Sequence, residues 1–219
     1  MKDRDKIYPE SGVELKPFVS KNYDRILSVA SLGHYPRSIR QAIDDMDIQS
    51  GDHILDMGCG TGYNTSLMTR YLGREGSVLG TDISEEMARQ FQQRFNGDDR
   101  LSFLNCRIDQ PFHLDRKFQK VFISFVIHGF PHEVRTKVID NARKHLEPGG
   151  SFYIFDFAEF DMDSMPAHHR FLFKSIECPY AFDFIKRDWK SILKEHGFRD
   201  FTEHFYMKKY VRLLQAKLS

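Results

Sequence analysis

Short apolar runs alternate with longer helix-like stretches from residue 53 onward. Such alternation is typical of repeated strand–helix–strand units around a parallel sheet. The expected strands are 53–57 (HILDM), 77–82 (SVLGTD), 101–105 (LSFLN), 120–126 (KVFISFV) and 151–157 (SFYIFDF), and the expected helices are 64–72, 84–95 and 132–145. Ser84 precedes two glutamates and is expected to cap the second helix, and LEPGG at 146–150 is expected to end the third.

The pattern changes after residue 157. Residues 158–185 mix Phe, Tyr, Met, His and Pro without a clear period, which favours an inserted lid-like cap. A helix is expected at 186–196, followed by two alternating runs, 198–206 and 209–218, that fit an antiparallel pair. Residues 1–50 carry helical patterns and are expected to cover the ligand edge as an N-terminal helical cap.

These patterns together predict a single α/β domain spanning residues 1–219. We expect a doubly wound, mostly parallel seven-stranded sheet with helices on both faces, an antiparallel edge strand near the C-terminus and a small helical, aromatic cap. The length of 219 residues is sufficient for a self-contained hydrophobic core.

Charge and cysteine content narrow the classes of partner. Thirty-two basic residues against thirty-one acidic ones give a net charge of +1, which disfavours nucleic acid as a partner. The three cysteines lack metal-ligand spacing, so we expect no metal site and a reducing, cytoplasmic environment. The start is charged and no run of eighteen apolar residues occurs, so we expect neither a signal peptide nor integral membrane association.

A glycine-rich loop follows the first expected strand. Gly58, Gly60 and Gly62 allow the backbone to approach a ligand closely, and the next helix start offers free N–H groups. A merely tight turn is the alternative interpretation. The spacing is G-x-G-x-G, with Tyr63 where dinucleotide-binding folds place their third glycine. Asp82 is placed to accept ribose hydroxyls, and Asp56 favours a cationic amino group over a pyrophosphate. The loop therefore favours a nucleoside that carries an amino acid.

The motifs ILDMGCGTG, VLGTDISEEM and LEPGG resemble those of class I, Rossmann-like S-adenosylmethionine-dependent methyltransferases, over residues 20–157. The resemblance implies S-adenosylmethionine as cofactor, with the methionine moiety facing Asp56 and the 58–62 loop, Cys59 included, and the ribose facing Asp82. Ile83 and Met87 would flank the adenine, although Met87 is equally interpretable as an inward-facing helical residue. Ser124, at the end of the fourth strand, is a further candidate cofactor-binding residue.

Two departures from the family pattern concern the adenine and the fourth strand. NCRIDQPF places Cys106 and Arg107 where many members have an acid and a small residue. A backbone N–H near Arg107 or Ile108 is then expected to serve the ring, with Asp109 as a substitute for the acid. Gln119 replaces an acid at the opening of the fourth strand, far from the ligand edge.

His128 is the candidate catalytic base, because it follows the fourth strand and has a pKa suited to proton transfer near neutral pH. A histidine that only shapes the pocket is the alternative. His128 and His132 have the i, i+4 spacing at which two histidines on a helix can bind one metal ion. Gly129 and Pro131, however, interrupt the helix that would align them. The Tyr-Asp pair at Tyr23 recurs in small-molecule members of the family, including quinone and phospholipid methyltransferases, which implies that Tyr23 reaches the methionine end.

Three functions remain open from the sequence. The leading one is a methyltransferase of a small, hydrophobic or aromatic molecule, because the cap is rich in phenylalanine. The alternatives are an NAD-dependent oxidoreductase and a catalytically inactive cofactor-binding partner subunit. The sequence names neither the acceptor nor the oligomeric state.

Overall fold

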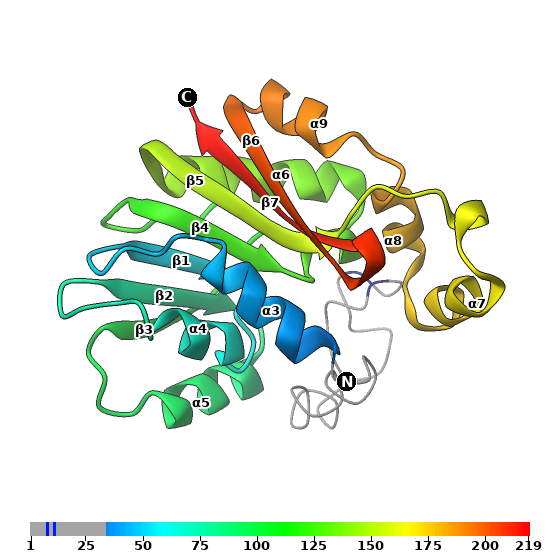
Figure 1. Cartoon of the computed structure of the whole chain (residues 1–219). Helices are drawn as coiled ribbons and strands as arrows, with labels where there is room; N and C mark the ends of the chain where they lie inside the picture. Colours follow the sequence, from blue (N-terminus) through cyan, green and yellow to red (C-terminus); the bar gives the residue numbers. More distant parts are fainter. Residues whose placement is uncertain (1–7, 9–10, 12–33) are drawn as a thin grey trace.

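The computed structural model describes residues 8, 11 and 34–219. Its centre is a seven-stranded sheet in the order β3-β2-β1-β4-β5-β7-β6 (Figure 1). The strands are β1 His53–Met57, β2 Ser77–Asp82, β3 Leu101–Asn105, β4 Phe118–Ser124, β5 Leu146–Phe157, β6 Phe198–Tyr206 and β7 Val211–Leu218. The predicted seven-stranded, mostly parallel sheet is confirmed.

The single antiparallel strand is β7, which pairs antiparallel with both β5 and β6. A short turn at Met207–Lys209 joins β6 directly to β7, so the two strands form a hairpin. The antiparallel strand therefore lies one position inside the sheet, and β6 forms the edge.

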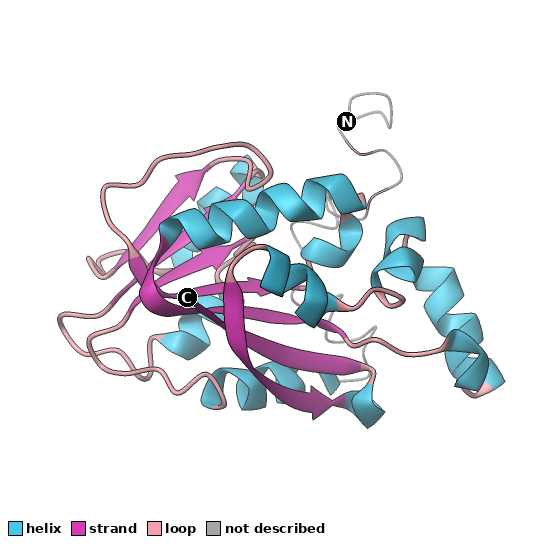
Figure 2. Cartoon of the chain, turned by 90° about the horizontal axis from the view of Figure 1, so that it is seen from above, coloured by secondary structure: helices cyan, strands magenta, loops and turns pink. Residues whose placement is uncertain are grey.

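Helices cover both faces of the sheet (Figure 2). The helices of the described residues are α3 His34–Asp44, α4 Tyr63–Met68, α5 Glu85–Arg94, α6 His132–His145, α7 Ala167–Ile176, α8 Pro179–Phe184 and α9 Trp189–Glu195. Of these, α7 projects beyond the end of the sheet (Figure 1). Alternate residues of each strand enter two separate cores: Leu55 packs with α6, α8 and α9, whereas its neighbour Ile54 packs with α3 and α4. This alternation gives the sheet two apolar faces, as a doubly wound fold requires.

Several element boundaries differ from the expected ones. β4 begins and ends two residues earlier than the apolar run, and β5 begins at Leu146, so the LEPGG segment lies within the strand. α4 ends at Met68 instead of residue 72. Ser84 caps α5 as expected, with its side chain accepting from the backbone N–H of Met87. The strand boundaries depend on pairing between β4 and β5, which local hydropathy does not encode.

The cap segment contains more regular structure than its aperiodic sequence indicates. Between β5 and α9 it forms a short turn at Met162–Ser164 and the helices α7 and α8. Part of the expected N-terminal cap, α3, packs against the sheet face that also carries α4. Within the part of the chain that the structure describes, no helix combines the length and the apolar character that a membrane crossing needs.

Candidate active site

The parallel strands bring the predicted site residues to one edge of the sheet. Met57 at the end of β1 is in register with Thr81 of β2 and with Ile123 of β4. The segments that follow these strands therefore leave the sheet side by side, at the end from which α7 and α8 project in Figure 1. In open α/β sheets, this carboxyl edge is where ligands bind.

The glycine loop adopts left-handed backbone conformations at all three glycines, with φ of 73° at Gly58, 55° at Gly60 and 78° at Gly62. A Cβ on Gly62 would lie 2.5 Å from a ring carbon of Phe95, so this glycine is required for packing. Among the described residues, a Cβ on Gly60 would meet only the Met87 sulfur, at 3.9 Å. The loop is therefore packed against α5 at Gly62 and open at Gly60, where a ligand can approach the backbone.

Asp56 is a buried acid beneath this loop, with a side chain 1% exposed. Its Oδ2 accepts a hydrogen bond from the Thr65 hydroxyl at 2.8 Å. Burial raises the pKa of Asp56 to about 7, and the charge of Asp82 contributes in the same direction. No cationic side chain among the described residues pairs with this buried carboxylate, which would gain most from a cationic partner.

Asp82 ends β2 and is fixed by two backbone donors. Its Oδ1 accepts from the N–H of Ser84 at 2.9 Å and its Oδ2 from the N–H of Gly60 at 3.1 Å. Burial raises the pKa of Asp82, although these backbone hydrogen bonds act in the opposite direction. Each carboxylate oxygen retains an acceptor position, so the side chain is oriented and able to accept from hydroxyl groups.

The two residues expected at the adenine differ in exposure. Ile83 is 38% exposed at the end of β2, whereas Met87 is 3% exposed and lies beneath Gly60. Ile83 is thus available to contact a ligand directly. Met87 faces inward beneath the loop, and its contact with the adenine stays a prediction.

The segment after β3 is held by an ion pair. Asp109 is buried and accepts hydrogen bonds from Arg107, at 3.1 and 2.5 Å, and from the Tyr8 hydroxyl at 2.8 Å. Burial alone would raise the pKa of Asp109, but these donors outweigh it and lower the pKa. The Ile108 carbonyl accepts from Asn141 at 2.7 Å. Asp109 and the Arg107 guanidinium therefore hold each other, and the expected contact of a backbone N–H near Arg107 or Ile108 with the adenine stays a prediction.

Two buried hydroxyls at this edge have no hydrogen-bond partner among the described residues. They are Thr81 Oγ1 in β2 and Ser124 Oγ at the end of β4. An unsatisfied buried hydroxyl costs about 1–3 kcal/mol, so natural proteins normally supply a partner from the chain, from water or from a ligand. A polar nucleoside ligand held by the loop, Asp56 and Asp82 fits this set of donors and acceptors.

His128 lies in a short turn after β4, between two carboxylates. Its Nδ1 lies 2.8 Å from Oδ1 and 3.0 Å from Oδ2 of Asp156, which is fully buried in β5. Its Nε2 lies 3.5 Å from Oε2 of Glu177, at the end of α7. Burial alone would lower the pKa of His128, but the charges of Asp156 and Glu177 outweigh it and raise the pKa.

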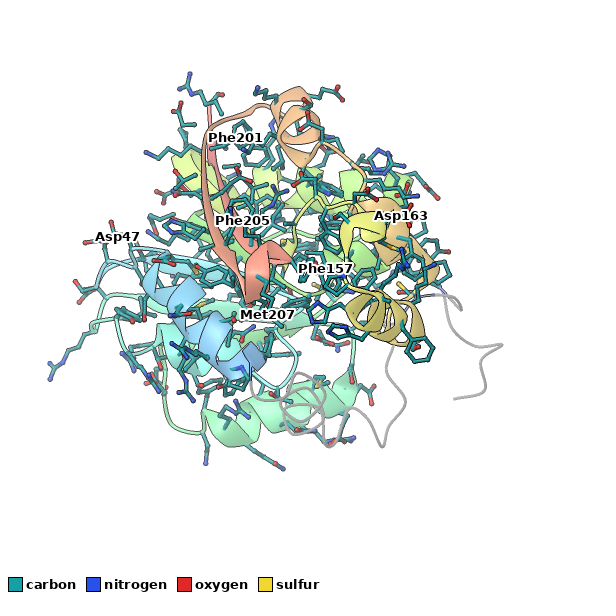
Figure 3. The ribbon with its side chains drawn as sticks, turned by 45° about the vertical axis from the view of Figure 1, so that its right-hand side comes forward. Asp47, Phe157, Asp163, Phe201, Phe205 and Met207 are labelled. Atoms are coloured by element: carbon teal, nitrogen blue, oxygen red, sulfur yellow. The ribbon has the colours of Figure 1, made fainter. Side chains whose placement is uncertain are left out.

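Aromatic rings surround this histidine. The ring of Phe157 lies 5.1 Å from that of His128, and those of Phe125 and Phe184 lie at 6.1 and 6.4 Å. Phe173 of α7 in turn contacts Phe157 at 5.0 Å, and Figure 3 shows Phe157 close to this helix. The neighbourhood of His128 is therefore apolar and aromatic, apart from its carboxylate partners.

Arg135 ties this region to the cap. Its side chain is fully buried in α6, and its guanidinium donates to the backbone carbonyls of His128 at 3.0 Å and Tyr180 at 2.6 Å. It also pairs with Asp183 of α8 at 2.6 Å. The turn that carries His128 is thereby fixed relative to α8.

Sequence reasoning missed Asp156, Glu177 and Arg135. Asp156 had a signal, since an acid stands alone in the apolar run YIFDF, whereas the other two had none. Tyr23 lies outside the described residues. Among residues 34–219, together with 8 and 11, no group of His, Cys, Asp and Glu has the geometry of a metal site.

Comparison with known proteins identifies a shared domain. Residues 54–150 match the model of the family described as "Methyltransferase domain". Demethylmenaquinone methyltransferase of Symbiobacterium thermophilum is 30% identical over 143 residues, 64% of this chain and 56% of that protein. The ubiquinone/menaquinone biosynthesis C-methyltransferase UbiE of Methylococcus capsulatus is 30% identical over 145 residues, 64% of this chain and 57% of that protein. The chain thus matches just over half the length of these curated relatives.

Two solved structures show the same fold. A SAM-dependent methyltransferase from Aquifex aeolicus superposes with a TM-score of 0.67 at 18% identity, covering 94% of this chain and 100% of that chain. Human N-acetylserotonin methyltransferase in complex with SAM gives a TM-score of 0.68 at 13% identity, covering 91% of this chain and 56% of that chain. At such low identity the likeness concerns the architecture of the sheet and its helices.

Proposed function

We propose that this chain, whose residues 54–150 match the family described as "Methyltransferase domain", is an S-adenosylmethionine-dependent methyltransferase that transfers a methyl group to a small, hydrophobic or aromatic molecule. The observation that carries the proposal is the meeting of two half-sites at one sheet edge. One is the glycine loop with Asp56 and Asp82. The other is His128 among its phenylalanine rings.

The first half-site has the groups that S-adenosylmethionine requires. Asp56 would pair with the ammonium of the methionine moiety, Asp82 would accept from the ribose hydroxyls, and the open Gly60 backbone would lie against the ligand. Ser124 would add a buried hydroxyl that has no partner among the described residues, and Ile83 an exposed apolar side chain. When bound, this cofactor supplies an electrophilic methyl group on a sulfonium.

The second half-site would hold the acceptor and take its proton. Asp156 holds the Nδ1–H of His128 at 2.8 Å, which leaves Nε2 as the basic nitrogen. An acceptor hydroxyl next to Nε2 would give its proton to that nitrogen. The electron pair left on the acceptor could then attack the methyl group. A base contributes about 10² to 10⁴ in rate for such acceptors.

The relatives narrow the acceptor class. Two of them are named for demethylmenaquinone and for ubiquinone/menaquinone biosynthesis. An aromatic quinol has both a flat apolar ring, which suits Phe125, Phe157 and Phe184, and an ionisable hydroxyl, which suits His128. We therefore infer a quinol-type acceptor. We also propose that the protein works in the cytoplasm, in keeping with three cysteines that form no disulfide.

The two other functions considered at the start are not supported. An NAD-dependent oxidoreductase would need the dinucleotide glycine pattern, and Tyr63 stands in place of its third glycine. The matching family and both curated relatives are methyltransferases, which equally disfavours a subunit without chemistry.

Calorimetric titration with S-adenosylhomocysteine and with NAD tests the first half-site. We expect binding of S-adenosylhomocysteine alone, whereas binding of NAD alone would reverse the cofactor assignment. His128→Ala tests the second half-site. We expect kcat to fall about 10² to 10⁴-fold with unchanged cofactor affinity. A change confined to KM would make His128 a residue that only shapes the pocket.

A further inference from the structure

Glu177 of the cap occupies the position at His128 that an acceptor needs. It follows Ile176 at the end of α7, and its backbone N–H donates to the carbonyl of Phe173. Its Oε2 lies 3.5 Å from Nε2 of His128, and its side chain is 20% exposed. The carboxylate therefore reaches His128 from the cap and keeps a path to solvent.

Nε2 is the only nitrogen of His128 through which it can act as a base. Nδ1 lies within 3.0 Å of both oxygens of Asp156, whose oxygens also accept from the backbone N–H groups of Phe157, at 2.8 Å, and His128, at 3.4 Å. Asp156 is thus fixed and fully buried, and it commits Nδ1 to donation. Any group that holds a proton on Nε2 makes the ring an imidazolium with no basic lone pair.

The charges that face His128 come from three elements among the described residues. Asp156 lies on β5, Glu177 at the end of α7, and Arg135 on α6, where its guanidinium donates to the His128 carbonyl at 3.0 Å. The remaining neighbours are the rings of Phe125, Phe157 and Phe184. Two carboxylates against one guanidinium favour a positive charge on the imidazole.

We propose that Glu177 is a positioning residue that holds the proton on Nε2 of His128 until the acceptor displaces it. This proposal rests on the proposed role of His128 as the base. With Glu177 in place, His128 is an imidazolium and the site is inactive. When the acceptor takes the position of Glu177, the base is released next to its substrate.

The proton balance closes over one turnover. As Glu177 leaves, the negative charge that helps to raise the pKa of His128 leaves with it, so the Nε2 proton is released to solvent on the exposed side of the cap. The acceptor O–H bond breaks next: its proton goes to Nε2, and its electron pair stays on the acceptor to attack the methyl carbon, whose bonding pair to sulfur remains on sulfur. His128 is again an imidazolium, ready to bind Glu177.

The pH dependence of turnover tests displacement directly, since kcat/KM reports the free enzyme and kcat the substrate complex. With S-adenosylmethionine and a 1,4-naphthoquinol as probes, the wild-type acid limb of kcat/KM should lie at higher pH than that of kcat. In Glu177→Gln, the kcat/KM limb should move down to meet the unchanged kcat limb. Below both midpoints, kcat/KM should rise roughly tenfold for each pH unit of this shift.

The matched control is Asp163→Asn. Asp163 also lies in the cap, where Figure 3 labels it, but it pairs with Arg170 at 3.1 Å and its side chain is 89% exposed. This variant should leave both limbs where they are in the wild type. Limbs that are unchanged in Glu177→Gln would overturn the proposal, and an equal shift of both limbs would show that Glu177 stays in place when the acceptor binds.

Titration of His128 by NMR separates this proposal from the proposed function, because it needs no turnover. The midpoint should be lower in Glu177→Gln than in the wild type, and the wild-type midpoint should fall when S-adenosylhomocysteine and the naphthoquinol are both added. Equal midpoints in the two proteins, or a wild-type midpoint unmoved by the two ligands, would overturn the proposal. Absence of methyl transfer together with the expected titrations would instead refute the proposed function alone.

Discussion

Replacing Asp56 with Asn should stabilise the ligand-free protein at alkaline pH while weakening cofactor binding. Burial raises the pKa of Asp56 from 3.8 to about 7. Between about pH 4 and pH 7 the folded protein therefore keeps a proton that the unfolded chain has already released. The free energy of unfolding falls as pH rises through this window. A shift of about three units corresponds to about 4 kcal/mol, which is an upper limit for the loss above pH 7.

Asn removes this penalty at little structural cost, because its carbonyl oxygen can still accept from the Thr65 hydroxyl, which donates to Asp56 at 2.8 Å. In ligand-free thermal unfolding at pH 8, Asp56→Asn should melt above the wild type. Each kcal/mol corresponds to about 2–4 °C for a chain of this size. At about pH 3 the two proteins should melt at nearly the same temperature, since the wild-type acid is then largely protonated in both states.

Asp56→Asn should lower the affinity for S-adenosylhomocysteine at pH 8, because the neutral Asn side chain cannot form an ion pair with an ammonium group. Loss of a charge-assisted hydrogen bond costs about 1.5–3 kcal/mol. A melting difference that does not depend on pH would refute the assignment of a raised pKa to Asp56. Unchanged affinity would place the amino group of the ligand elsewhere.

Three further predictions concern the loop, the ribose site and the cap. Gly62→Ala should lower the melting temperature of the ligand-free protein, because the new methyl group collides with Phe95. Gly60→Ala should cost only about 1–2 kcal/mol of left-handed backbone strain but abolish the stabilisation by S-adenosylhomocysteine. A larger loss of ligand-free melting temperature in Gly60→Ala than in Gly62→Ala would contradict the assignment of Gly60 as the open position of the loop. Asp82→Ala should weaken the binding of S-adenosylhomocysteine, measured by calorimetry, by about 1.5–3 kcal/mol. Unchanged affinity would show that the ribose does not bind to this acid. Limited proteolysis should cut first within 158–185 and more slowly once cofactor and acceptor are bound; equal rates would make the segment a fixed part of the fold.

The sequence was sufficient for the parts of the fold that depend on local periodicity. Five apolar runs correctly located five parallel strands, and the helix expected at 132–145 has the same bounds as α6. The glycine loop was also predictable, because glycine adopts a positive φ at little cost and Gly58, Gly60 and Gly62 all do so.

Features that depend on tertiary packing were not predictable. The order of β7 and β6 depends on which strand pairs with β5, and Glu177 meets His128 only because the end of α7 lies next to the turn that follows β4. Ile83 and Met87 lie four residues apart around the start of α5, yet one is exposed and the other is buried. Sequence spacing alone does not show which of the two side chains is exposed, since the direction in which each points depends on how α5 packs on the sheet.

Transfer of a labelled methyl group from S-adenosylmethionine to a 1,4-naphthoquinol is the most direct test of the proposed function. The wild type should form labelled product and S-adenosylhomocysteine in equal amounts. His128→Ala should bind the cofactor normally and form product about 10² to 10⁴ times more slowly, and Gly60→Ala should form none. Cofactor binding without any labelled product, across quinols and other small aromatic acceptors, would contradict the assignment of this site as a small-molecule methyltransferase.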